Sequence, residues 1–329
     1  MHVTPLVWVL SLGITIALLV IDVVFVGRRP RIPTMAECLR YLGLYIGLAV
    51  LFGLWVWATH GGRYAAEFYA GWLTEYSLSV DNLFVFLLIL AKFGVPRKYQ
   101  QTALLVGIIL ALVFRGIFIG IGAVAIAEFS WVFYLFGAFL IWTAVKVGRE
   151  GESDDDDFEP PLLVRWVQRV LPSTPDYHGV KLTAREGGKR LITPMLIVLV
   201  ALGATDLLFA FDSIPAIFGL TKEPYLVLMA NLFALMGLRQ LYFLLGNLLT
   251  KLVYLNVGLA VLLGFIGVKL VLHAMHDNEL PFVNGGSPIA WAPDLPIGVS
   301  LGAIVGILAV TTIASLAKSR RDERAELSN

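Results

Sequence analysis

Nine long apolar stretches constrain the fold of this chain more than any other feature of its sequence. A helix needs about 20 largely apolar residues to cross the hydrocarbon core of a bilayer. Because no water is available there, a crossing segment must satisfy its own backbone hydrogen bonds, so such stretches predict transmembrane α-helices. The stretches cover residues 5–26, 39–59, 66–91, 102–127, 130–147, 192–219, 225–247, 252–273 and 296–317.

The composition supports a membrane protein and excludes several other classes. Hydrophobic residues make up 58% of the 329 residues and charged residues 15%, and the mean hydropathy of +0.81 lies outside the range of soluble domains. The net charge is only +1 and the basic residues are spread along the chain, so nucleic-acid binding is not predicted. The single cysteine, Cys38, excludes an intrachain disulfide and a cysteine-cluster metal site. We therefore predict an all-α, polytopic protein in the lipid bilayer.

The basic residues of the connections predict the orientation of the chain. Lys and Arg are retained on the cytoplasmic side of a membrane, and here they follow the first, third, fifth, seventh and ninth stretches. The first stretch lacks a basic leader and a small-residue cleavage site, so it is expected to be a retained span. The prediction is a multi-pass protein of the cell (inner or plasma) membrane, with its N-terminus outside and its C-terminus in the cytoplasm.

The third and sixth stretches share a pattern of acidic and small polar residues. Each has a carboxylate and, six residues later, a second carboxylate followed by a small polar side chain. These residues are Glu75, Asp81 and Asn82 in one stretch, and Asp206, Asp212 and Ser213 in the other. The next stretch of each carries an isolated arginine, Arg115 or Arg239. Because each repeat has three spans, an odd number, we predict two inverted three-helix repeats.

The repeats divide the chain into five parts. We predict an N-terminal two-helix scaffold (1–60), repeat 1 (61–147), a cytoplasmic acidic linker (148–190), repeat 2 (191–273), and a last part (274–329) with an extracytoplasmic loop, the last span and a basic cytoplasmic tail. Within repeat 2, Pro215 predicts an interruption of the sixth stretch, since proline removes a backbone hydrogen bond.

The intramembrane charges predict a cation site. An ionised side chain at the bilayer centre costs about 2.5–3.5 kcal/mol on insertion scales, so these acids and arginines need partners or a wet cavity. Inverted repeats would bring the six acidic and small polar residues together near the midplane. Their oxygens suit hard divalent ions such as Mg²⁺, Ca²⁺ and Mn²⁺, and the acidic stretches contain no His or Cys. Arg115 and Arg239 would neutralise the acids when the ion is absent. A static ion pair that only fixes helix packing is the alternative.

Three motifs resemble the TerC/Alx family of bacterial membrane proteins, within the wider LysE-type transporter group. They are EYSLSVDNLFVF at 75–86, TDLLFAFDSIPAIF at 205–218 and NLFALMGLRQLYFLL at 231–245, and the resemblance covers about residues 40–317. It implies export of Mn²⁺, or its supply to exported enzymes, with Glu75, Asp81, Asn82, Asp206 and Asp212 in the ion pathway. Some members have a further Glu three residues before the acid that matches Asp206, where this chain has Gly203.

The predicted function is therefore transport of a divalent metal cation, with Mn²⁺ as the leading candidate for the ion. Exchange for protons is the candidate driving force. No permanently bound cofactor is expected. An enzyme is not predicted, because no nucleophile with a base and no metalloprotease motif is present at a suitable depth. The alternative function is a non-transporting membrane scaffold of a metal or tellurite stress-response complex. The sequence leaves the oligomeric state open.

Overall fold

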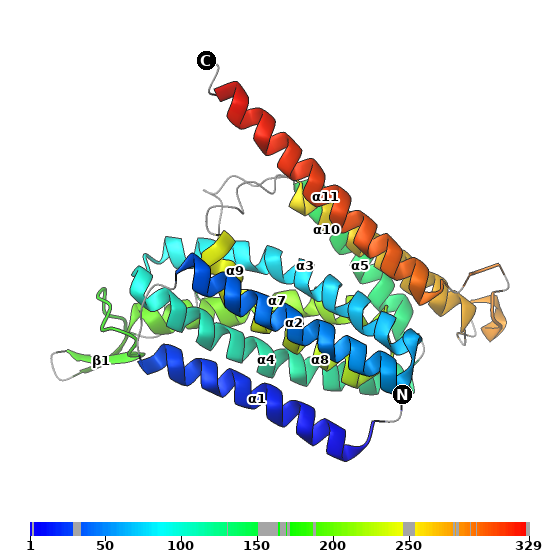
Figure 1. Cartoon of the computed structure of the whole chain (residues 1–329), viewed down its shortest axis with the longest axis horizontal. Coiled ribbons are helices and arrows are strands. Elements are labelled where there is room, and N and C mark those ends of the chain that lie inside the picture. Colours follow the sequence, from blue (N-terminus) through cyan, green and yellow to red (C-terminus); the bar gives the residue numbers. More distant parts are fainter. Residues whose placement is uncertain are drawn as a thin grey trace.

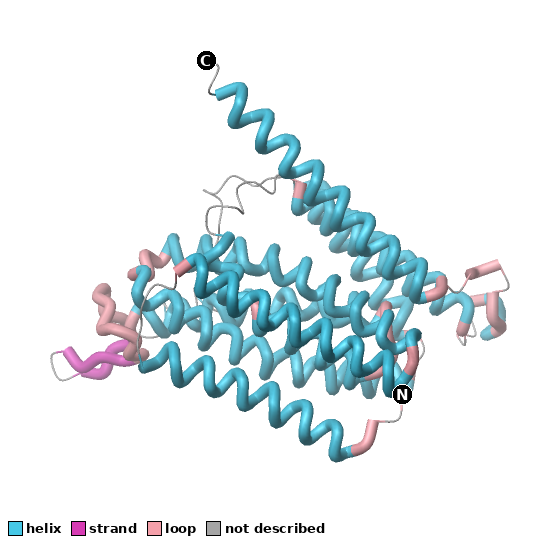
Figure 2. The backbone as a smooth tube through the Cα atoms, in the orientation of Figure 1, coloured by secondary structure: helices cyan, strands magenta, loops and turns pink. Residues whose placement is uncertain are grey.

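Long helices make up most of the protein (Figures 1 and 2). The computed structural model describes residues 1, 3–28, 34–129, 131–150, 164, 169, 172–186, 189–245, 254–278, 280, 283–289, 291–293 and 295–326, and a few side chains within these ranges, among them those of Asp81 and Asp212, lie outside the description. The helices are α1 (Pro5–Arg28), α2 (Met35–His60), α3 (Gly62–Lys92), α4 (Arg97–Glu128), α5 (Val132–Glu150), α7 (Pro194–Phe218), α8 (Pro224–Met236), α9 (Leu238–Leu245), α10 (Leu255–His276) and α11 (Ile297–Glu326), with a 3-10 turn at Asn284–Gly286.

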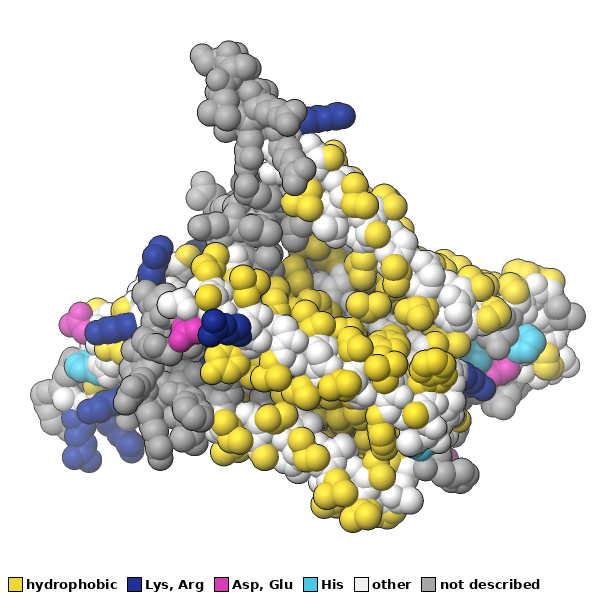
Figure 3. All heavy atoms as spheres, in the orientation of Figure 1, with side chains coloured by type: hydrophobic (Ala, Val, Ile, Leu, Met, Phe, Trp, Pro, Cys, Tyr) yellow, Lys and Arg dark blue, Asp and Glu magenta, His cyan; other side chains and the backbone are white. Residues whose placement is uncertain are grey.

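The predicted all-α, polytopic class is confirmed. In the described part of the chain, 8 helical segments are long and apolar enough to cross a membrane, counting α8 and α9 together. The ninth expected span lies in α1. Among the described residues its apolar part, Pro5–Leu18, is shorter than a full span. Figure 3 shows hydrophobic side chains over most of the visible face, as lipid-facing helices require.

Local sequence signals set several helix ends. At the start of α2, the Thr34 hydroxyl accepts from the backbone N–H of Glu37, and the Glu37 carboxylate accepts from the N–H of Thr34. This reciprocal cap satisfies two N–H groups that the first turn leaves without partners. Between α2 and α3 the chain turns at Gly61, whose φ of 94° only glycine adopts readily.

The break within repeat 2 is not where the sequence predicted it. Helix α7 is continuous from Pro194 to Phe218 although Pro215 lies inside it. The prediction of an interruption there is wrong, because Pro215 lies in the last turn, where the loss of one N–H donor disturbs little of the helix. The break falls in the following span, at Gly237 between α8 and α9.

Helices α5 and α10 pack against each other through two glycines. A Cβ on Gly137 would lie 2.9 Å from the carbonyl oxygen of Gly267, and a Cβ on Gly267 would lie 3.0 Å from that of Gly137. Gly137 also faces Val271, four residues beyond Gly267, while Gly267 faces Ile141, four residues beyond Gly137. This reciprocal pattern shows that the two helices run antiparallel, as the third helices of two inverted copies would. The repeat relationship itself stays a prediction.

A small hairpin marks one end of the bundle, at the boundary between the predicted linker and repeat 2. Strands β1 (Thr183–Glu186) and β2 (Lys189–Ile192) pair antiparallel, with Thr183 opposite Ile192. Nearby, the Tyr177 hydroxyl donates to the carbonyl oxygen of Phe93 at 2.7 Å and so ties this segment to the end of α3; burial raises the pKa of Tyr177. The acidic run at 154–157 lies outside the described residues, and the predicted division into five parts stays a prediction.

Candidate functional site

Arg115 of α4 lies at the centre of a buried polar cluster and is 1% exposed. Its Nε donates to Oδ2 of Asp206 at 3.4 Å, and its Nη2 donates to Oδ1 of the same carboxylate at 3.2 Å. Its Nη1 forms an ion pair with Oε1 of Glu75 and also donates to Oδ1 of Asn231 at 2.9 Å. One guanidinium thus holds two carboxylates and a carboxamide.

Asn82 completes the set of acceptors around Arg115. In the carboxamide orientation that satisfies its neighbours, its oxygen accepts from Arg115 Nη2 at 3.2 Å and its nitrogen donates to the Leu78 carbonyl oxygen at 3.1 Å. A guanidinium has five N–H donors. Four of the five donors of Arg115 then have a hydrogen-bond acceptor, and its Nη1 also forms the ion pair with Glu75.

Four helices bring these side chains together. Glu75 and Asn82 come from α3, Arg115 from α4, Asp206 from α7 and Asn231 from α8. All five residues are buried. At such depth a charge persists only when it is paired or replaced by its neutral form. Glu75 and Asp206 thus meet on one arginine, and their role as metal ligands stays a prediction.

The charge of this cluster does not cancel. Two ionised carboxylates and one guanidinium carry a net charge of −1, and Arg115 is the one cation in contact with both acids among the described side chains. No described residue forms a hydrogen bond with Oε2 of Glu75. A buried excess of negative charge favours uptake of a proton or of a metal cation. Binding and release of cations is what this arrangement can do chemically.

Several buried hydroxyl groups adjoin the carboxylates in the chain. Thr74 precedes Glu75 and Thr205 precedes Asp206, and neither hydroxyl has a hydrogen-bond partner among the described residues. The same holds for the hydroxyl of Ser213, a predicted ligand. The two threonines occupy matching places in the two acidic motifs, so the repeat contained a signal that the prediction did not use. Asn231 was also missed as a site residue.

All the predicted site roles stay predictions, and three of the predicted residues are not placed at the Arg115 cluster by the described side chains. Asp81 lies in α3 and Asp212 in α7, but their side chains are outside the described part of the structure. Arg239 lies on α9, and in the orientation that satisfies it, the Gln240 carboxamide oxygen accepts from Arg239 Nη2 at 3.0 Å. Among the described side chains, no three His, Cys, Asp or Glu residues gather as a metal site would require.

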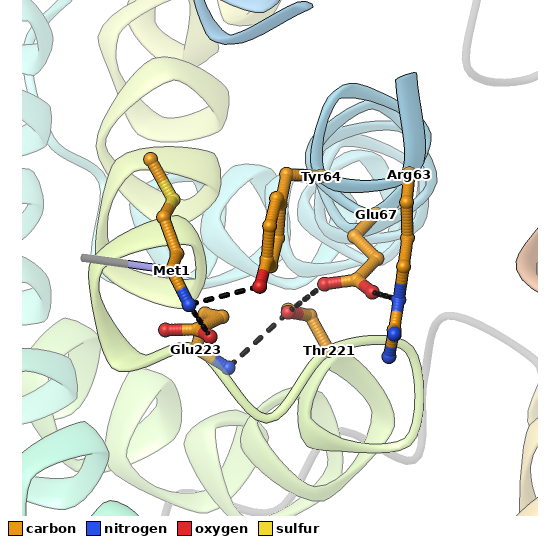
Figure 4. Close-up of polar contacts among 6 residues, drawn as sticks. All are labelled: Met1, Arg63, Tyr64, Glu67, Thr221 and Glu223. Carbon is orange, nitrogen blue, oxygen red and sulfur yellow. Dashed lines mark hydrogen bonds and ion pairs between the residues drawn. The ribbon is translucent and has the colours of Figure 1, made fainter. Parts of the chain in front are cut away.

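A cavity of about 440 Å³ opens at the end of the bundle opposite the hairpin. We call it the vestibule; its polar lining comes from Arg63, Tyr64, Glu67, Thr221, Lys222, Glu223, Lys269 and His273. Glu67 is 5% exposed. Its Oε1 accepts from Arg63 Nε at 2.9 Å, and its Oε2 accepts from the Thr221 hydroxyl at 2.7 Å (Figure 4). A second buried carboxylate on α3 therefore faces an open space.

Figure 4 also shows Glu223 and Met1 beside this group. The backbone N–H of Glu223 donates to the Thr221 hydroxyl at 3.2 Å. The Met1 amino group donates to the Tyr64 hydroxyl at 2.9 Å and forms an ion pair with Glu223. The hydrogen bond to Glu223, and then the one to Tyr64, raise the pKa of this amino group.

The vestibule and the Arg115 cluster share one face of α3. Glu67 and Glu75 are eight residues apart, which is about 12 Å along a regular helix and about 80° around it. Gly71 lies between them on the same face, where a Cβ would only touch Ile217 and Ala230. The face between the two carboxylates is thus lined by a residue without a side chain.

Comparisons with known proteins agree with the motifs. The model of the integral membrane protein TerC family matches residues 60–323. A membrane protein of Mycobacterium tuberculosis (strain H37Rv) is 46% identical over 325 residues, which cover 97% of this chain and 81% of the relative. A membrane protein of Myxococcus xanthus is 38% identical, over 96% of this chain and 94% of the relative.

A relative from Escherichia coli (strain K12), named as a candidate membrane-bound redox modulator, Alx, is 36% identical over 94% of each chain. No solved structure matches. The resemblance inferred from the three motifs is confirmed, whereas the wider LysE-type grouping stays a prediction.

Proposed function

Because this chain belongs to the TerC family of integral membrane proteins, we propose that it transports a divalent metal cation across the membrane, with efflux of Mn²⁺ as its activity. One observation carries the proposal: buried carboxylates from α3 and α7 meet on a single guanidinium, and their charges exceed that of the arginine. A site that only fixed helix packing would be expected to balance its charges.

In this proposal, Arg115 and the metal ion alternate at the carboxylates. Arg115 occupies the place between Glu75 and Asp206 when the metal is absent, and the ion takes the same oxygens when it binds. Asn82 and Ser213 add neutral oxygens, and Asp81 and Asp212 add two further carboxylates. A set made of oxygens alone suits Mn²⁺, Mg²⁺ or Ca²⁺ better than Zn²⁺ or Cu²⁺.

The excess negative charge also supports exchange of the metal for protons. Two carboxylates share one guanidinium in a dry site, so a bound proton can offset the excess negative charge when the metal is absent. A divalent ion would displace that proton as it binds. Proton exchange across the membrane is therefore the proposed driving force.

The vestibule is the proposed outer mouth of the pathway. Its buried carboxylate, Glu67, lies on the same face of α3 as Glu75, with Gly71 between them. The basic side chains visible in Figure 3 gather mainly at the opposite, hairpin end of the bundle, and α11 shows basic side chains only near its C-terminal end. Because basic residues are retained on the cytoplasmic side, we assign the hairpin end to the cytoplasm and the vestibule to the outside.

Uptake of ⁵⁴Mn²⁺ into inverted membrane vesicles tests this function. Glu75→Gln keeps the shape of the side chain but removes its charge, and should reduce initial uptake at least tenfold. Glu128→Gln is the matched control, because Glu128 is an exposed glutamate at the end of α4. If the Glu75 variant took up the ion as fast as the parent, the assignment of the site would be wrong. Competition by unlabelled Mg²⁺, Ca²⁺ and Zn²⁺ tests the identity of the substrate.

A scaffold that does not transport is the second candidate function. The E. coli relative is named as a candidate redox modulator, and the folded hairpin β1–β2 supplies a surface outside the helices. Deletion of residues 151–187 removes the acidic run and strand β1 and so separates the two functions. A scaffold that acts through this segment should lose its stress phenotype, whereas a transporter should keep much of its ⁵⁴Mn²⁺ flux.

A further inference from the structure

Asn231 is a buried polar residue to which the transport proposal assigns no role. It lies in α8, where nearly every neighbour is a buried apolar side chain, and it is 1% exposed. Its Oδ1 accepts from Arg115 Nη1 at 2.9 Å. Its Nδ2 has no hydrogen-bond partner among the described residues. A buried carboxamide with an unsatisfied N–H group lowers the stability of the fold, so its presence here calls for an explanation.

The position of Asn231 differs from that of the other acceptors of Arg115. Glu75 and Asn82 lie on α3 and Asp206 lies on α7, the two helices with the acidic motifs. Asn231 lies on α8, which has no acidic residue. If a metal ion took the oxygens of α3 and α7, the acceptor on α8 would be the one left to the guanidinium. A buried cation needs such a partner, because an unpaired one is strongly unfavourable.

The chemistry of Asn231 fits the same role. Its oxygen accepts a hydrogen bond from Arg115 without adding a negative charge, so it holds the guanidinium but competes weakly for a divalent ion. Its unpaired Nδ2 can donate to a carboxylate oxygen or to a water molecule that arrives with the ion. The free donor is thus explained by a second state of the site.

We propose that Asn231 is a positioning residue that holds the Arg115 guanidinium against Glu75 and Asp206, so that the arginine helps to displace the transported cation. This inference rests on the proposed transport function. Without Asn231 the arginine competes less well, so the cation binds more tightly and leaves more slowly. The expected signature is a fall in both KM and maximal rate.

Initial rates of ⁵⁴Mn²⁺ uptake into inverted vesicles, measured against Mn²⁺ concentration and normalised to folded protein, test this role. Asn231→Ala should lower KM about tenfold, because one hydrogen bond to a charged group is lost from the competing arginine, and should lower the maximal rate as well. Asn231→Asp keeps the acceptor and strengthens its hold on Arg115, so its KM should equal or exceed that of the parent. Gln101→Ala removes a buried carboxamide from α4, fourteen residues before Arg115 in the helix, and should leave KM unchanged.

The outcomes separate this inference from the proposed function. A lower maximal rate with an unchanged or higher KM in Asn231→Ala would show a purely structural role and overturn the inference alone. A KM below that of the parent in Asn231→Asp would make this position a ligand of the cation, which also overturns it. Should Asn231→Ala fail to fold, the isosteric Asp variant still tests the inference, because a KM below that of the parent would overturn it. Parent vesicles that take up no ⁵⁴Mn²⁺ would overturn both proposals.

Discussion

Helix α3 carries two glutamates that each pair with an arginine, in opposite surroundings. Glu67 pairs with Arg63, whose side chain is 79% exposed at the vestibule. Glu75 pairs with Arg115, which is 1% exposed. Water can replace Arg63 at little cost, because exposed ion pairs contribute about 0–1 kcal/mol. Arg115 can leave only if another cation or a proton takes its place.

The comparison shows why only the inner pair suits a coupled transport site. A transporter must link the departure of one charged group to the arrival of another, and burial enforces that link at Arg115. At the vestibule, solvent screens the charges and the link is lost. In the proposed function, the outer carboxylate would receive an ion and the inner cluster would exchange one.

The first prediction concerns a variant that lacks the buried arginine. Arg115→Met leaves Glu75 and Asp206 together in a dry site without their counter-charge, so the metal-free protein should lose about 3–5 kcal/mol of stability. Chemical unfolding in detergent with a chelator present measures this loss. The double variant with Asp206→Asn should recover part of it. An Arg115→Met protein as stable as the parent would show that the buried ion pair contributes no more to stability than the exposed one.

The second prediction separates transport from stability at the same site. Asp206→Asn brings the described cluster to neutrality, since one carboxylate then faces one guanidinium. We expect ⁵⁴Mn²⁺ uptake to fall at least tenfold, while the midpoint of thermal unfolding stays at or above that of the parent. Parallel losses of uptake and of stability would instead indicate a cluster that only holds the helices together.

The third prediction concerns the buried side of the outer pair. Thr221→Val removes the hydroxyl that donates to Glu67 at 2.7 Å but keeps the shape of the side chain. Because Glu67 is almost fully buried, loss of this charged hydrogen bond should cost about 1.5–3 kcal/mol of stability. The lower value is expected, since water in the vestibule can replace the hydroxyl. Thermal unfolding measures the change, and Thr221→Ser, which keeps the hydroxyl, should behave as the parent.

The smallest effect is expected on the exposed side of that pair. Arg63→Ala should change stability by less than about 0.5 kcal/mol, because its guanidinium is already in water. Thermal unfolding in low and in high salt measures this small difference, which should shrink further as salt screens the pair. A loss comparable to that of Arg115→Met would mean that exposure does not separate the two pairs.

The sequence predicted much of this arrangement for identifiable reasons. Charges are so costly in lipid that Glu75, Asp206 and Arg115 were conspicuous in apolar stretches, and their repetition indicated that they meet. Asn231 was missed because it has no counterpart in the other repeat, and a neutral amide in a helix is a weaker signal than a charge. The break at Gly237 was missed because proline is a stronger local signal than glycine, although Pro215 lies where a helix is already ending.

The mutual contact of Gly137 and Gly267 limits how the molecule can move. Since each backbone carbonyl occupies the space where the other residue would have a side chain, neither helix can turn about its own axis without a collision. We expect α5 and α10 to travel as one rigid strut that joins the two halves of the chain. In the proposed transport cycle, the pathway would then open to either side through shifts of α3, α4, α7 and α8 against that strut. A single methyl group added at either glycine should separate α5 from α10.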